Sequence, residues 1–230
     1  HFSPPRGVRG VPKRPARTMG HRALIAYERP DGSYNLHHSH WGGLRLRLTY
    51  EITQETPFGG DPPDERLQTI HTHLLEAASD KAIDDVLDGL DVPHHPVDIE
   101  PWDIRCTLDT IITEYLDYLH HEAFYVVDPE FEVTVYRTHW FGLQYDCKAV
   151  TDSPTVGNGA LRTIRWYDGK PVGDGFAQGE FRALKNVTGD MVDREVFAGG
   201  EAIEYLKQKL AEWVGEEQEL IIRTPACNAE

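Results

Sequence analysis

A hairpin pattern near the start of the chain constrains the fold more than any other feature. Residues 23–27 (ALIAY) form a short apolar run, Pro30-Asp31-Gly32 supplies turn residues, and residues 34–41 (YNLHHSHW) read as a second extended segment. Two such runs joined by a turn of this composition are typical of paired antiparallel strands. We therefore predict a sheet that begins with this hairpin.

Helical spacing of apolar residues occurs in three later regions. The first opens at Pro62-Pro63-Asp64 and runs to Leu90, with a break at Ser79-Asp80. The second covers residues 108–119 and has the clearest helical period of the chain. The third covers residues 203–214 and stops at Gly215, which we expect in a left-handed conformation.

Extended segments alternate with these helices. Leu44, Leu46 and Leu48 alternate with arginines and predict a half-buried strand. Residues 173–179 (GDGFAQG) miss the G-x-G-x-x-G spacing of a dinucleotide loop and are interpreted as turns between strands. Because regular strand–helix alternation is missing, we predict an α+β fold, a largely antiparallel sheet built from hairpins with about three helical segments packed on it. Further strands are predicted at residues 124–127, 131–140, 161–167 and 220–222, the third of them turning at Asp168-Gly169-Lys170.

The composition changes sharply at Met19. Residues 1–18 contain four prolines, five basic residues and no acidic residue. One interpretation is a basic, extended arm that contacts nucleic acid or an acidic partner. The other, which we favour, is translated sequence upstream of Met19 as the biological start. Residues 19–230 are long enough to form a single domain with a sizeable core.

The predicted domain is strongly acidic. The chain carries a net charge of −15, and without the five basic residues of the extension 18 basic residues remain against 38 acidic ones, which gives −20. Only seven of the 23 basic residues are lysines. Such a surface keeps a protein soluble where salt screens charge repulsion, so the composition indicates an extreme halophile rather than an ordinary acidic mesophile. Nucleic acid is disfavoured as a partner, because phosphate binding needs a basic surface.

Cysteine usage and hydropathy bear on the compartment. Cys106, Cys147 and Cys227 are widely spaced and contain no C-x-x-C pair, so neither a disulfide framework nor a zinc ribbon is indicated. No apolar run approaches the length of a membrane span, and residues 1–18 lack the apolar core of a secretory signal. We expect a cytoplasmic protein without a membrane partner.

Two similar strings mark the best candidate for a site. Residues 39–44 (SHWGGL) return about a hundred positions later as residues 138–143 (THWFGL). If the two strand ends are neighbours, His38, His40 and His139 converge. Three imidazoles with a carboxylate or a water would suit Zn²⁺, Mn²⁺ or Fe²⁺, because neutral nitrogen ligands on rigid strands leave an open position for substrate.

Other interpretations of these residues remain open. The histidines also fit hydrogen-bonded or half-exposed strand residues beside a tryptophan. A Ser39–His40 catalytic dyad is disfavoured, because neighbours on a strand point to opposite faces. Aromatic rings could line a pocket for a planar ligand, although core packing is their commoner role. The candidates for such a pocket are Trp41, Trp140, Tyr34 and Tyr136.

The opening segment also resembles a known family. Residues 19–27 (MGHRALIAY), Asp31-Gly32 and residues 39–42 (SHWG) look like the start of a haloarchaeal protein family of unknown function. They are more distantly similar to bacterial and phage proteins of unknown function that begin M-G-T-R and continue to an H-W-D-G-Y-P string. Gly42 stands where those distant relatives have Asp, and the Tyr-Pro that follows is absent. The resemblance implies that Met19 is the start and that the host is a haloarchaeon or one of its viruses, and it implies no reaction.

Two hypotheses about function follow. The first is a non-catalytic binding or accessory module for a protein or small-molecule partner, with the His40-Trp41 and His139-Trp140 region as its recognition surface. The second is a hydrolase that depends on a divalent transition metal held by His38, His40 and His139. No other cofactor is indicated.

Overall fold

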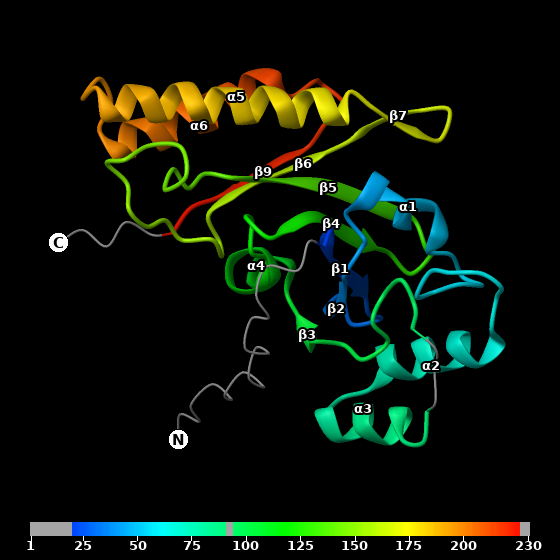
Figure 1. Ribbon diagram of the computed structural model, residues 1–230. Coiled ribbons are helices and arrows are strands. Elements are labelled where there is room, and N and C mark those ends of the chain that lie inside the picture. Colours follow the sequence, from blue (N-terminus) through cyan, green and yellow to red (C-terminus); the bar gives the residue numbers. More distant parts are fainter. Residues whose placement is uncertain (1–19, 91–93, 226–230) are drawn as a thin grey trace, which may run out of the picture.

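The computed structural model describes residues 20–90 and 94–225, so the predicted extension of residues 1–18 and its boundary at Met19 lie outside the described residues. The described chain forms a seven-stranded sheet with the order β3-β2-β1-β4-β5-β6-β9 and a separate hairpin of β7 and β8 (Figure 1). The mixed fold and the mostly antiparallel sheet are confirmed. The strands are β1 (Arg22–Glu28), β2 (Tyr34–Ser39), β3 (Asp103–Cys106), β4 (His121–Val127), β5 (Val133–Trp140), β6 (Gly159–Thr163), β7 (Arg165–Tyr167), β8 (Lys170–Val172) and β9 (Leu220–Arg223).

Strand β1 connects the two halves of the sheet. It pairs with β2 as the predicted hairpin, with Ala23 opposite Ser39. Its other edge pairs in parallel with β4, where Ala123 lies opposite Ala23. All other strand pairs are antiparallel. The central pair of the sheet therefore joins segments that are far apart in the sequence.

The described residues form six α-helices, so the prediction of about three helical segments is too low. None of these helices is long and apolar enough to cross a lipid bilayer. Two further short turns are a 3₁₀ helix, η1, and a π-helical turn, η2. The bounds are η1 (Leu44–Leu46), α1 (Leu48–Glu51), α2 (Glu65–Glu76), α3 (Asp80–Leu87), α4 (Leu108–Thr110), η2 (Ile111–Tyr115), α5 (Asp174–Asp193) and α6 (Gly199–Trp213).

The sheet has two buried faces. On the first face, Ala23, Ile25 and Tyr27 of β1 pack with residues of α1, α2 and α3. The same face is covered farther along, over β5, β6 and β9, by α5 and α6 (Figure 1). On the second face, Leu24 and Ala26 pack against the short α4–η2 segment. Apolar side chains alternate along β1 between these faces, as burial on both sides of a central strand requires.

Local signals predicted the helix starts well. Asp64 accepts a hydrogen bond from the backbone N–H of Arg66 as the N-cap of α2. Ser79 accepts one from the N–H of Ala82 as the N-cap of α3, so the predicted break there is confirmed. Caps of this kind satisfy backbone donors that the first helical turn leaves unpaired.

Four predictions of local structure are wrong. Residues 44–48 form helical turns instead of a strand, because the chain reverses there with Arg45 and Leu46 at positive φ. The helix predicted over residues 108–119 ends at η2, since β4 begins at His121. Residues 173–179 open the longest helix, α5, with Gly173 in the left-handed conformation as its N-cap. Gly215 is not among the residues with positive φ, and Val214 ends α6 in an extended conformation.

Gly42→Ala is expected to destabilise the fold by about 1–3 kcal/mol, the usual range for overpacking. A Cβ at Gly42 would lie 2.8 Å from Leu48 Cδ1 and 2.9 Å from the Cβ atoms of Ala23 and Ser39. A Cβ at Gly175, on α5, would meet nothing within 4 Å, so Gly175→Ala is the matched control and should leave stability unchanged or raised. Urea unfolding of both variants measures the difference, and equal midpoints would contradict the packing argument.

Candidate functional site

Two exposed tryptophans mark the end of the sheet where β2 finishes and β1 and β4 begin. Trp41 is 40% exposed and Trp102 is 46% exposed. We call the His–Trp surface the group of Trp41, Trp102, His21, His38 and His40. His38 lies on β2, opposite Leu24 of β1, and His40 follows directly after the strand ends at Ser39. Large exposed rings at the end of a sheet are a candidate for recognition rather than packing.

Trp102 is held against β2 by the backbone of the segment that precedes β3. The backbone N–H of Trp102 donates to Leu36 O at 2.7 Å, and the backbone N–H of Asp98 donates to His38 O at 2.9 Å. The indole therefore stacks on the imidazole of His38, with ring centroids 4.6 Å apart and planes 7° from parallel. His38 Nδ1 lies 3.0 Å from Asp98 Oδ2, which fixes the ring from the other side.

Trp41 stands between two other imidazoles. Its ring centroid lies 4.9 Å from that of His40 and 6.0 Å from that of His21. His21 Nδ1 lies 2.7 Å from Glu122 Oε2, so this ring is also held by a carboxylate. A Cβ at Gly20 would lie 2.8 Å from His40 Nε2, which explains why the residue before His21 is a glycine.

His121 is buried at the back of this surface. Its ring lies 6.3 Å from His38 and 6.2 Å from Trp102. Its Nδ1 accepts a hydrogen bond from the backbone N–H of Asp117 at 3.0 Å, so the other ring nitrogen carries the proton. Burial lowers the pKa of His121 to about 3, which keeps the ring neutral near pH 7.

The structure does not bring His38, His40 and His139 together. The register from β2 through β1 and β4 to β5 places His139 on the first face and His38 on the second. Three strand spacings also separate β2 from β5, about 14 Å. Among the residues that the structure describes, no group of three or more His, Cys, Asp or Glu side chains is placed to hold a metal ion. A single ion cannot reach all three predicted ligands, because the sheet itself stands between them.

The second His-Trp string is part of the core. His139 is 2% exposed and packs edge-on against Phe181, with centroids 4.8 Å apart. Trp140 is 6% exposed, and its Nε1–H donates to Pro154 O at 2.8 Å. Tyr34 and Tyr136 pack with Trp140 in the cluster of the second face, away from Trp41. Of the four predicted ligand-binding rings, Trp41 is the exposed one, at 40%.

Sequence reasoning missed a cluster of buried charges on the first face. Arg137 of β5 and Arg162 of β6 are each 6% exposed and lie directly opposite one another. Asp174, the first residue of α5, accepts hydrogen bonds from Arg137 Nε and Nη2, the shortest at 2.7 Å. The available signal was an arginine inside each of two predicted strands, but that signal alone does not tell which strands pair.

A second group of buried polar rings lies under α2. Tyr27 meets His37 and His71 edge-on, with centroids 5.2 Å and 4.8 Å apart. His37 Nδ1 lies 2.8 Å from Asp98 O, so that nitrogen donates to the carbonyl. Burial lowers the pKa of His37 to about 4 and that of His71 to about 3, so both rings are neutral near pH 7.

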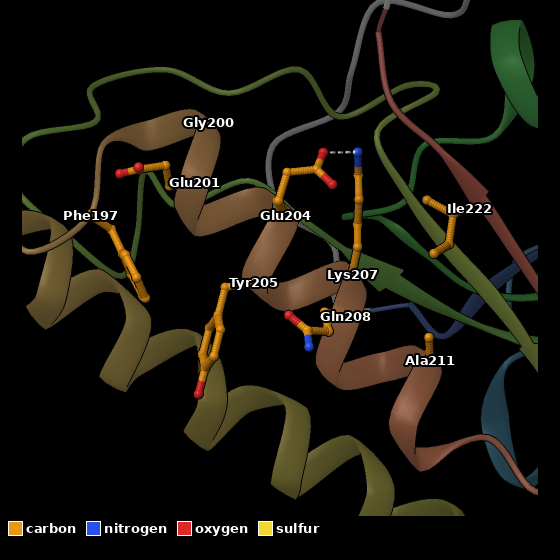
Figure 2. Close-up of a pocket in the computed structure, with 9 residues that line it drawn as sticks. All are labelled: Phe197, Gly200, Glu201, Glu204, Tyr205, Lys207, Gln208, Ala211 and Ile222. Carbon is orange, nitrogen blue, oxygen red and sulfur yellow. Dashed lines mark hydrogen bonds and ion pairs between the residues drawn. The ribbon is translucent and has the colours of Figure 1, made fainter.

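A shallow groove of about 840 Å³ lies between the outer side of α6 and the edge strand β9 (Figure 2). Its charged side chains pair with their neighbours: Lys207 Nζ lies 2.6 Å from Glu204 Oε1, and Glu201 accepts from the N–H of Ala198 at 2.9 Å. Phe197 and Tyr205 contact one another with centroids 5.3 Å apart. The groove therefore presents no side chain that calls for a ligand.

Comparison with known proteins gives one match. The model of a family of unknown function, DUF6735, matches residues 19–222. No curated protein and no solved structure matches the chain.

Proposed function

The chain belongs to the DUF6735 family, for which no function is established, and we propose that it is a non-catalytic binding module that docks a partner protein on the His–Trp surface. The observation that carries this proposal is the exposure of Trp41 and Trp102, 40% and 46%, at one end of the sheet. Tryptophan contributes more binding energy per residue than most side chains at protein interfaces.

The neighbours of the two indoles support a docking role. Trp102 rests on His38 and Trp41 lies beside His40 and His21, so each indole is backed by at least one imidazole. Asp98 and Glu122 hold two of these imidazoles by hydrogen bonds. Rings fixed in this way lose little side-chain entropy on binding, which favours affinity.

A partner of complementary charge fits this surface. Asp98 and Glu122 are both about two-fifths exposed, at 42% and 43% of their side chains. The chain as a whole carries a net charge of −15. We therefore assign the partner a basic rim around apolar pockets that accept the indoles. The acid-rich, lysine-poor composition supports a setting in the cytoplasm of an extreme halophile.

The double variant Trp41→Ala/Trp102→Ala is expected to lose the partner while keeping the fold. Immobilised wild-type and variant chains would be incubated with host extract in molar potassium chloride, and the captured proteins compared by quantitative mass spectrometry. The matched control is Tyr167→Ala, which removes an aromatic ring that is 78% exposed on the β7–β8 hairpin. At least one protein should be retained by the wild type and by Tyr167→Ala and fall about tenfold or more on the double variant.

Identical capture by all three chains would refute the proposal. Circular dichroism of the double variant accompanies the experiment, because loss of capture counts only if the variant is folded. A protein that is retained by Tyr167→Ala but not by the double variant would then be purified, and its affinity for the wild-type chain measured by titration.

A further inference from the structure

Two buried arginines occupy neighbouring positions on the first face of the sheet. Arg137 and Arg162 are register partners on β5 and β6, and each is only 6% exposed. Like charges placed together in a water-poor setting repel one another and are costly to bury unless each has an anionic partner. The question is therefore whether the protein supplies an anionic partner for each of the two arginines.

Arg137 is fully paired by the protein. Its Nε and Nη2 donate to both carboxylate oxygens of Asp174, and its Nη1 donates to Gly43 O at 2.9 Å and to Glu122 O at 3.4 Å. This is the fork-on-carboxylate geometry that arginine favours. The charge of Asp174 is thus engaged by Arg137.

Arg162 has no such partner in residues 20–90 and 94–225. Within these described residues, the guanidinium of Arg162 makes no hydrogen bond and no ion pair within 4 Å, and its Nε is buried and unpaired. Asp174 and Glu180 act on it only at longer range, and burial lowers its pKa. Arg162 is only 6% exposed as a residue, and its guanidinium has no anionic partner among the described residues, so an anion bound there would meet an unpaired positive charge.

His139 adds a second unpaired polar atom on the same face. It stands two residues from Arg137 on β5, and its Nε2 is buried without a hydrogen-bond partner among the described residues. The charge of Arg162 acts on this ring, and burial lowers the pKa of His139 to about 3. The ring is therefore neutral near pH 7 and can donate one hydrogen bond without adding to the positive charge.

The first turn of α5 lies over this pair. Asp174 opens the helix there, after Gly173 in the left-handed conformation. The amide groups of a first helical turn point their N–H bonds outward and favour a negative charge. A Cβ at Gly175 would meet nothing within 4 Å, so the outer side of this turn is open.

We propose that Arg162 and His139 bind an oxyanion, a carboxylate or phosphate group of a ligand, beside the first turn of α5. The planar fork of a guanidinium matches two oxygens of one group, which favours an oxyanion over a halide ion. This site is independent of the His–Trp surface, because Arg162 lies on the opposite face of the sheet from His38.

The test is isothermal titration calorimetry with inorganic phosphate and, separately, with acetate, at constant ionic strength. The wild type should bind at least one of the two anions saturably, and Arg162→Gln should weaken that binding at least tenfold. Arg194→Gln is the matched control, because it removes an exposed arginine at the opposite end of α5 and should change binding less than twofold. Binding of phosphate alone would assign a phosphorylated ligand, and binding of acetate alone a carboxylic acid.

The proposal is overturned by no saturable binding of either anion, by equal binding in Arg162→Gln, or by an equal loss in Arg194→Gln. A second variant keeps the test independent of folding. Arg162→Met replaces an unpaired charge by an apolar side chain of similar length, so its thermal midpoint should rise while anion binding is lost. A lower midpoint would mean that Arg162 already has a structural partner, and the site would then be withdrawn.

Discussion

Asp174→Asn is expected to destabilise the folded chain by about 3–5 kcal/mol, the range for breaking a buried ion pair by removal of one partner. The side chains of Arg137 and Asp174 are only 7% and 12% exposed, and the distance between Arg137 Nη2 and Asp174 Oδ2 is 2.7 Å. Without the carboxylate, the buried guanidinium of Arg137 would lose its anionic partner. Urea unfolding at pH 7 measures the loss.

A double variant separates the pair from its surroundings. Arg137→Met/Asp174→Asn should recover a large part of the lost stability, because it removes the uncompensated charge together with its former partner. Glu212→Gln breaks the half-exposed pair with Lys209 and should leave the midpoint unchanged. The single variant Arg137→Met completes the comparison. If the stability loss of the double variant equals the sum of the losses of Arg137→Met and Asp174→Asn, the two residues are not coupled and the explanation fails.

Mild acid is expected to unfold the protein between about pH 6 and pH 4. Burial holds the pKa of His37 at about 4 and those of His71, His121 and His139 at about 3, below the ordinary value of 6.5. Below pH 6.5 the unfolded chain therefore binds protons that the folded chain does not, and stability falls as the pH falls. Each group costs about 1.4 kcal/mol per pH unit, so four cost about 5 kcal/mol per unit, comparable with the whole stability of many domains.

Urea unfolding at half-unit pH steps checks this dependence. His71→Leu should reduce the slope of unfolding free energy against pH by about 1.4 kcal/mol per unit. His73→Leu, on the exposed side of the same helix, is the control and should keep the full slope. A chain that remains folded at pH 4, or a slope that His71→Leu leaves unchanged, would show that these rings are protonated in the folded state.

The parts of the fold that were predictable depend on neighbouring residues alone. The hairpin of β1 and β2 follows from two apolar runs and a turn, and the start of α2 follows from Asp64 after two prolines. The parallel pairing of β1 with β4 has no such signal, because the two strands are brought together by packing across the whole domain. Helix α5 was also missed, since its first residues include Gly175 and Gly179 and have weak helical propensity.

The candidate site shows the same limit. That His37 and His38 point to opposite faces of β2 could be argued from the sequence. That His139 lies on the other face could not, because it depends on the order and register of four strands. The stacking of Trp102 on His38 could not be predicted either, since nothing in the segment of Trp102 indicates that contact.

The parallel pair at the centre of the sheet also bears on how the chain folds during synthesis. The inner edge of β1 has no partner until residues 121–127 have left the ribosome, and the last strand, residues 220–223, completes the sheet only when nearly all of the described chain has been made. Contacts between distant segments slow folding, because a long loop must close before they form. The nascent chain therefore carries an open, apolar strand edge for most of its translation, and that period is when it depends most on protection from aggregation.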